Sequence, residues 1–144
     1  MANNPKLLRG VVPPVCTPFT SDYEVDEKSL RKLINHLLDG GVHGLFVLGS
    51  TSEVAYLTDK RRADVIRIAI DETAGRVPVV AGAIDMTTFR VNEHVKAAVD
   101  AGIDGIVVTA PFYVRTHPEE IALHFKQIKE ACGDVPLYAY DIPV

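Results

Sequence analysis

A short segment of this sequence places three hydroxyl side chains and a carboxylate directly after an apolar run. The run ends at residue 48 and is followed by Gly49-Ser50-Thr51-Ser52-Glu53. Backbone N–H groups near the glycine and the hydroxyls of Ser50 and Thr51 can bind a substrate carboxylate, and hydroxyls can also transfer protons. The same residue types form ordinary turns in which Ser and Thr bond the local backbone. The spacing alone leaves both interpretations open.

Two tyrosine positions are further candidates. Tyr140 shares a short apolar run with Tyr138, and we expect only one of these two side chains to point into the interior. A buried tyrosine needs a hydrogen-bond partner, and a tyrosine in a strand belongs to a core more often than to a catalytic site. Tyr113 lies in a loop beside Pro111, where its ring can form a ligand wall, a subunit contact or a loop anchor.

The elements that must position these residues follow from the apolar periodicity, which alternates between strand-like runs and helical stretches. The predicted strands span residues 11–17, 45–48, 77–81, 105–109 and 137–141. The predicted helices begin at Asp26, at Thr58, at Thr87 or Thr88, and at Pro118, and each ends at a glycine. In the second helix we expect Ala63, Ile66 and Ile70 to face the sheet. Strands that alternate with helices predict an α/β fold with a parallel sheet.

Two features favour a barrel over an open, doubly wound sheet. Residues 41–45 and 102–106 share a pattern of glycine, apolar residue, polar residue, glycine and strand, two units apart. No glycine-rich phosphate loop follows the first strand. A complete TIM (β/α)8 barrel needs about 250 residues. We therefore predict a partial TIM barrel of about (βα)4 plus a fifth strand, with residues 1–144 as a single half-barrel domain, and keep the doubly wound sheet as the alternative.

Composition and charge exclude several classes of partner. The formal net charge of −4 offers no basic face for nucleic acid, and no apolar run is long enough to span a membrane. Two cysteines without a motif and five scattered histidines predict no metal or redox cofactor, with surface or packing roles for the histidines, and a reducing, cytoplasmic location. A small molecule is the expected partner.

Taken together, the strand-end segments resemble one family of enzymes, the pyruvate-dependent class I aldolases and lyases of the dihydrodipicolinate synthase and N-acetylneuraminate lyase family. The matching segments occur in order across the chain: GVVPPVCTPF at 10–19, GSTSE at 49–53, PVVAG at 78–82, VTAPFY at 108–113 and YDIP at 140–143. The resemblance implies a barrel enzyme that makes or breaks a carbon–carbon bond in a keto acid such as pyruvate, without a cofactor.

The resemblance also implies roles for individual residues. Ser50 and Thr51 resemble the hydroxyl pair that binds the pyruvate carboxylate and relays protons. Tyr140 resembles the tyrosine that acts with them as acid and base. Tyr113 resembles the aromatic residue that reaches the site of a neighbouring subunit. Two departures, Ser52 in place of a glycine and Asp141 in place of an asparagine, leave open the second substrate and the choice between synthase and lyase.

The family reaction further requires a lysine on the sixth barrel strand, which forms a Schiff base with pyruvate. In this sequence every lysine falls in the N-terminal arm or on a predicted helix: Lys6, Lys28, Lys32, Lys60, Lys96, Lys126 and Lys129. We therefore expect the chain to be the N-terminal half of such an enzyme and to be inactive alone. A non-catalytic module that binds a keto acid, or only a structural half-barrel assembly module, is the alternative.

A half-barrel has a surface that must be covered. Five strands of a barrel sheet leave two open edges, and we expect apolar side chains facing the barrel interior to be exposed. Such surfaces drive association, so we predict a homo-oligomer in which half-barrels pair across their open edges.

Overall fold

The computed structural model describes residues 8–142, which form one parallel sheet covered by helices. The strands are β1 (Leu45–Val47), β2 (Val79–Gly82), β3 (Gly105–Val108) and β4 (Leu137–Ala139). The helices are α1 (Glu27–Asp39), α2 (Asp59–Thr73), α3 (Thr88–Asp100) and α4 (Pro118–Cys132). Two short 3-10 turns, η1 (Ser50–Ser52) and η2 (Val54–Tyr56), connect β1 to α2. None of the helices in residues 8–142 is both long and apolar enough to cross a membrane.

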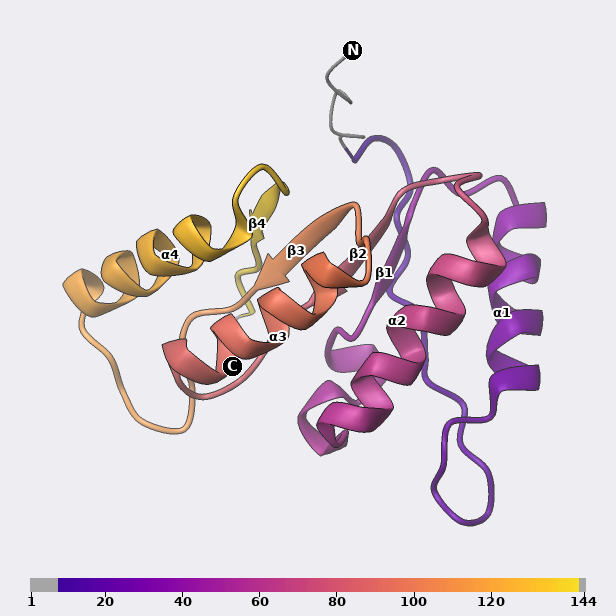
Figure 1. Cartoon of the computed structure of the whole chain (residues 1–144), viewed down its shortest axis with the longest axis horizontal. Helices are drawn as coiled ribbons and strands as arrows, with labels where there is room; N and C mark the ends of the chain where they lie inside the picture. Colours follow the sequence, from indigo (N-terminus) through magenta and orange to yellow (C-terminus); the bar gives the residue numbers. More distant parts are fainter. Residues whose placement is uncertain (1–7, 143–144) are drawn as a thin grey trace.

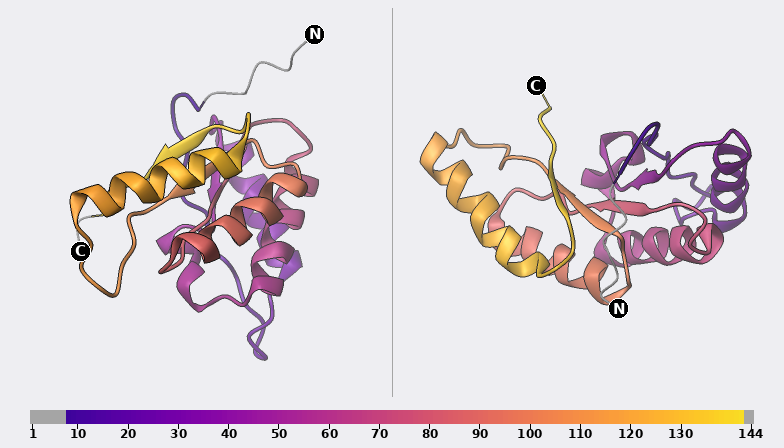
Figure 2. Two further views of the ribbon diagram at one scale, coloured as in Figure 1. Left: turned by 60° about the vertical axis from the view of Figure 1, so that its left-hand side comes forward. Right: turned by 90° about the horizontal axis from the view of Figure 1, so that it is seen from above.

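The strand order identifies the sheet as part of a barrel. The strands lie in the order β1-β2-β3-β4, and each neighbouring pair is parallel. The four helices follow one another along one side of the strands (Figures 1 and 2). A doubly wound sheet reverses its strand order and carries helices on both faces. The partial-barrel prediction is confirmed, and the doubly wound alternative is wrong.

Ring contact across the sheet shows how strongly it curves. Phe46 lies on β1 and Tyr140 directly follows β4, so three strand spacings, or about 14 Å in a flat sheet, separate their strands. Their ring centroids are nevertheless only 5.6 Å apart, with the rings at 83°. Both side chains therefore project into the concave face that becomes the interior of a barrel.

The predicted first strand, residues 11–17, is wrong as a regular strand. This segment makes a single parallel bridge between Pro14 and Phe46. The Phe46 N–H donates to the Pro13 carbonyl at 3.1 Å, and the Val15 N–H donates to the Phe46 carbonyl at 2.8 Å. Proline has no N–H, so two consecutive prolines interrupt a ladder that would otherwise continue. The segment still lies along β1 and covers that edge of the sheet.

The predicted helix starts are confirmed. Asp26 caps α1 by accepting a hydrogen bond from the Ser29 N–H at 3.0 Å, and Thr58 caps α2. Thr87 is the cap residue of α3, and Pro118 occupies the first position of α4, where the missing N–H costs nothing. These local signals fix where the helices begin.

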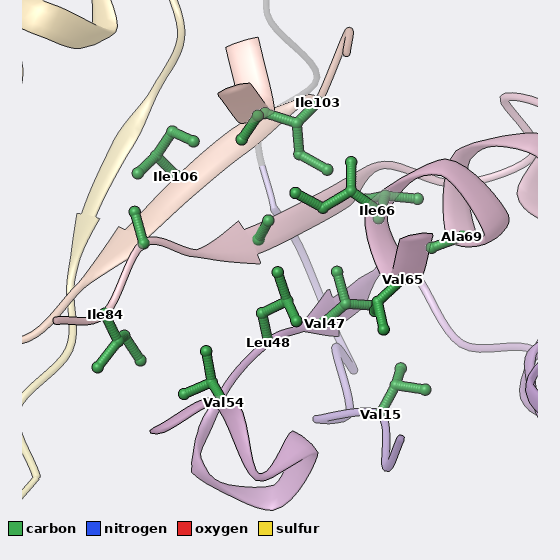
Figure 3. Close-up of a cluster of buried hydrophobic side chains, with 14 of the residues drawn as sticks. Val15, Val47, Leu48, Val54, Val65, Ile66, Ala69, Ile84, Ile103 and Ile106 are labelled. Atoms are coloured by element: carbon green, nitrogen blue, oxygen red, sulfur yellow. The ribbon is translucent and has the colours of Figure 1, made fainter. Parts of the chain in front are cut away.

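The core fills the layer between the sheet and the helices. Figure 3 shows Val47 on β1 next to Val65 on α2, and Ala69 on the same helix belongs to the same cluster. Leu30 and Ile34 on α1 are completely buried. Burying one such aliphatic side chain contributes about 1.5–3 kcal/mol. Because β2 and β3 are buried on both faces, their sequences are continuous apolar runs, and the polar residues lie at the strand ends.

The apolar side chains of the barrel interior are more buried than expected, although Phe46, Tyr138 and Tyr140 on that face stay partly exposed. Val80 and Val107 face the interior and are only 1% and 6% exposed. Their cover includes Tyr138, whose ring would contact any Cβ added to Gly105. The large exposed apolar side chains of residues 8–142 lie outside the strands: Val11, Tyr23, Tyr56, Met86, Phe89, Phe112, Tyr113, Val114 and Leu123. One edge does remain open, because no strand of the described chain pairs with the far side of β4.

Candidate active site

A pocket of about 400 Å³ lies where the carboxyl ends of the four strands meet. In barrels of parallel strands this end carries the catalytic residues. The lining residues all follow a strand: Ser50, Glu53, Val54, Ala55, Tyr56, Ile84, Thr109, Ala110, Pro111, Phe112, Tyr140, Asp141 and Ile142. The surface is mostly apolar, with a few hydroxyl and carboxylate groups, which suits a small organic acid.

The backbone that presents Ser50 is sharply bent. Leu48 is buried and has φ of 58°, a left-handed conformation that is uncommon for a residue with a side chain. Its carbonyl oxygen approaches Gly82 so closely that a Cβ at Gly82 would lie 2.0 Å from it. Glu53 on the other side of the 3-10 turn also has φ of 58°. The 3-10 turn η1 therefore lies between two residues in the left-handed backbone conformation.

Ser52 anchors this turn to the N-terminal segment. Its side chain is fully buried, and its hydroxyl donates a hydrogen bond to the Val15 carbonyl. The Ser52 N–H donates to the Gly49 carbonyl at 3.1 Å. The segment does form a turn, but the Ser52 hydroxyl bonds a carbonyl 37 positions away in the chain and not the local backbone. Ser50 and Thr51 are exposed and remain available to a ligand.

The predicted site residues divide into two groups. Ser50 and Tyr140 line the same pocket although 90 positions separate them in the chain. Thr51 and Tyr113 are not among the lining residues. Tyr113 is 90% exposed and has φ of 82°, so its ring lies in solvent. The roles of these four residues stay predictions.

The expectation that only one of Tyr138 and Tyr140 faces the interior is wrong. Residues two apart in a strand share a face, because side chains alternate with a period of two. Tyr140 contacts Phe46 on the concave side. The Tyr138 ring lies beside the position of a Cβ on Gly105, which pairs with Val80 on that same side. Tyr138 fills the interior nearer the amino ends of the strands, and Tyr140 lies at the carboxyl ends.

His124 on α4 binds the backbone of Thr109, which lines the pocket. It is 2% exposed, and its Nε2 lies 3.2 Å from the Thr109 carbonyl while its Nδ1 lies 2.9 Å from the Thr88 hydroxyl. A carbonyl only accepts, so Nε2 carries the proton and Nδ1 accepts from Thr88. Burial lowers the pKa of His124, which keeps the ring neutral. The expected packing role of this histidine is confirmed.

Arg62 is the residue that hydropathy missed. We expected Ala63 to face the sheet, but Ala63 is exposed and Arg62 is 7% exposed. Its guanidinium donates to the carbonyls of Val54, Leu57 and Ile84 at 3.0, 3.3 and 2.9 Å. Position 62 lies one turn before buried Ile66, and this spacing was a usable signal.

Amines and metal ligands do not gather at the pocket. No group of three or more His, Cys, Asp or Glu side chains within residues 8–142 is arranged to hold a metal ion. The lysines of the described chain all lie on helices: Lys28, Lys32, Lys60, Lys96, Lys126 and Lys129. Lys6 lies outside the described residues. None of the pocket-lining residues is a lysine.

Comparison with known proteins gives a consistent result. A family model described as the dihydrodipicolinate synthetase family matches residues 7–144. A 4-hydroxy-tetrahydrodipicolinate synthase of Salinibacter ruber is 40% identical over 95% of this chain and 45% of its own length. The synthase of Methanothermobacter thermautotrophicus is also 40% identical, over 94% of this chain and 48% of its own length. The chain spans about half the length of the curated relatives it matches.

Solved structures agree with the fold. The Escherichia coli K12 prophage protein YagE, of the dihydrodipicolinic acid synthase family and solved in complex with pyruvate, superposes with a TM-score of 0.91. It is 36% identical, over 95% of this chain and 46% of its own. An N-acetylneuraminate lyase of Mycoplasma synoviae gives a TM-score of 0.84 at 27% identity, over 93% of this chain and 46% of its own. Since the family model covers nearly the whole sequence, the chain belongs to the dihydrodipicolinate synthetase family.

Proposed function

We propose that this chain supplies the carboxylate-binding and proton-transfer part of a pyruvate-dependent aldolase or lyase that works through a Schiff base. The observation that carries the proposal is the meeting of Ser50 and Tyr140 in one pocket at the strand ends. Relatives named as 4-hydroxy-tetrahydrodipicolinate synthase and a similar protein crystallised with pyruvate support the reaction class.

The geometry supports a division of labour among these residues. Ser50 and Thr51, on the turn that begins at Gly49, present hydroxyl and N–H donors to the carboxylate of a keto acid. The Tyr140 hydroxyl at the end of β4 exchanges a proton with the reacting carbon or oxygen. Tyr113, which is fully accessible here, acts in the pocket of a second subunit.

The nucleophilic amine must come from elsewhere in the working enzyme. A Schiff base forms when an unprotonated lysine attacks the ketone of pyruvate and water leaves. The lysines on α1–α4 project from helices, while the pocket lies at the strand ends. We assign the amine to polypeptide outside these 144 residues, so that the chain alone forms no imine.

Borohydride trapping tests this assignment. The 144-residue chain is incubated with pyruvate and sodium borohydride, and its intact mass is measured. We expect no mass increase, with a full-length family aldolase treated in parallel as the positive control. A reduced pyruvate adduct, located by peptide mapping on one of the helix lysines, would contradict the proposal.

A second candidate function, a module that binds a keto acid without catalysis, is favoured by a pocket that forms without any amine. Calorimetric titration with pyruvate decides between a binding module and a purely structural half-barrel. Binding that is weakened by Ser50→Ala supports the first. A titration without heat, on protein that circular dichroism shows to be folded, leaves only the structural version.

We also propose that the chain self-associates. The side chains of Tyr56 and Phe112 are exposed beside the pocket, those of Tyr113 and Val114 are exposed in the loop that follows, and within residues 8–142 no strand pairs with the outer side of β4. Exposed apolar surface of this kind favours association. Analytical ultracentrifugation at micromolar concentration is expected to show a dimer or larger species, and a monomer across the whole range rejects the proposal.

A further inference from the structure

Arg62 is a buried cation whose hydrogen bonds go to main-chain carbonyls. It lies on α2, and all three of its nitrogens donate: Nε to the Leu57 carbonyl, Nη1 to the Ile84 carbonyl and Nη2 to the Val54 carbonyl. A planar guanidinium with five donors can bridge several acceptors in fixed directions, which an ammonium on a flexible stem cannot.

The three carbonyls belong to the two loops that form adjacent walls of the pocket. Val54 and Leu57 lie in the loop from β1 to α2, which also carries Ser50. Ile84 lies in the loop from β2 to α3. Val54 and Ile84 both line the pocket, and Figure 3 shows the Val54 side chain next to Leu48. A single side chain therefore fixes the spacing of the two walls.

The three hydrogen bonds of the Arg62 guanidinium go to carbonyl groups and none goes to a carboxylate. Burial lowers the pKa of the guanidinium, and the nearby carboxylates Asp85 and Asp59 oppose that effect. Asp85 immediately follows Ile84, and its Oδ2 lies 3.0 Å from Nε2 of His94. Carbonyl dipoles and this acidic surrounding together keep a buried cation in one orientation.

We propose that Arg62 is a positioning residue for the ligand site, which joins the β1–α2 loop to the β2–α3 loop and so holds the Ser50 turn opposite Tyr140. This inference rests on the proposed function, because it assumes that a keto acid binds at that turn. Loss of the guanidinium would leave the Leu57 and Ile84 carbonyls without this donor and the Val54 carbonyl with only the Leu57 N–H at 3.2 Å, and the loops would separate to hydrate the freed oxygens.

The test uses Arg62→Ala, Arg62→Lys and, as a matched control, Arg67→Ala, which removes a half-exposed arginine from the same helix. Pyruvate affinity is measured by calorimetry and loop opening by hydrogen exchange. We expect Arg62→Ala to weaken pyruvate binding by about tenfold or more. Exchange should accelerate in residues 49–57 and 83–87 but not in α1 or α4, and Arg67→Ala should resemble wild type.

Chemical rescue separates positioning from general stability. Millimolar guanidinium chloride should restore both affinity and exchange protection to Arg62→Ala, while sodium chloride at the same ionic strength should not. If Arg62→Ala does not fold, the Arg62→Lys variant must show the same selective loop exchange. Unchanged exchange in the two loops, or a uniform rise over the whole chain, overturns the proposal. If wild type binds no pyruvate, the proposed function fails, and the exchange and rescue data still decide the role of Arg62.

Discussion

Replacing Gly82 by alanine tests whether the close approach of two strand ends sets the site geometry. A Cβ at position 82 would lie 2.0 Å from the Leu48 carbonyl oxygen and 2.8 Å from its carbon. Real Cβ contacts essentially never fall below 3.0 Å, so the carbonyl must move by about 1 Å. The obstacle is backbone, and no change of rotamer can relieve it.

The expected cost follows from that displacement. Overpacking a core by one methyl group costs about 1–3 kcal/mol, and a backbone wall places this variant at the upper end. Alanine also lowers the entropy of the unfolded chain, which offsets about 0.4–1 kcal/mol. We therefore expect Gly82→Ala to lower the free energy of unfolding by about 2 kcal/mol, or the melting temperature by about 4–8 °C.

Gly44→Ala is the matched control. Gly44 lies immediately before β1, and a Cβ there would meet its nearest atoms at 3.2 Å, which small shifts can accommodate. Urea unfolding followed by circular dichroism should place the Gly44 variant within about 0.5 kcal/mol of wild type. If Gly82→Ala is equally stable, the reasoning about the Leu48 carbonyl is wrong.

Three further predictions concern the surroundings of the pocket. Ser52→Ala should lower the free energy of unfolding by about 1–3 kcal/mol, because the buried Val15 carbonyl loses its donor; urea unfolding measures this. His124→Asn should flatten the dependence of stability on pH below about 6.5, because burial lowers the pKa of His124 in the folded chain only. Tyr140→Phe should leave the melting temperature unchanged, whereas Tyr140→Ala loses the edge-to-face contact with Phe46, worth about 1 kcal/mol beyond the buried area.

Each of these predictions has an outcome that contradicts it. Ser50→Ala, at an exposed position on the same turn, serves as the control for Ser52→Ala, and equal stabilities would remove the role of the Ser52 hydroxyl. For His124, the unfolded chain binds more protons between the lowered folded pKa and about 6.5, so wild-type stability must rise with pH across that window. Parallel pH profiles for wild type and His124→Asn contradict this. A lower melting temperature for Tyr140→Phe would show that the hydroxyl stabilises the fold.

The fold was predictable where local signals and periodicity agreed. Cap residues such as Asp26 and Thr58 and the proline at 118 fix the helix starts through bonds to nearby backbone. The first strand was not predictable in the same way, because Pro13 and Pro14 satisfy the apolar pattern but cannot donate to a ladder. The segment lies where a strand would lie, with one bridge in place of several.

Side-chain direction was the harder problem at the site. Hydropathy assigns arginine to solvent; Arg62 does lie one turn before buried Ile66, but its guanidinium is stabilised by three carbonyls that only the folded loops bring together. Ser50 and Tyr140 could be brought together from sequence, because the carboxyl ends of parallel strands converge. Thr51 and Tyr113 could not be placed, because their positions depend on a 3-10 turn and on a left-handed loop residue that leave no periodic pattern.

The β1–α2 loop is restrained by several contacts within this chain. Left-handed Leu48 and Glu53 each store about 1–3 kcal/mol of strain, and such residues persist only where the surroundings over-determine them. The absence of a side chain at Gly82 leaves room for the Leu48 carbonyl. Ser52 binds the loop to the N-terminal segment at Val15, and Arg62 binds it to the β2–α3 loop at Ile84. The pocket is therefore preorganised within this chain. A ligand that enters this pocket meets Ser50 and Tyr140 in positions that contacts within the chain already fix.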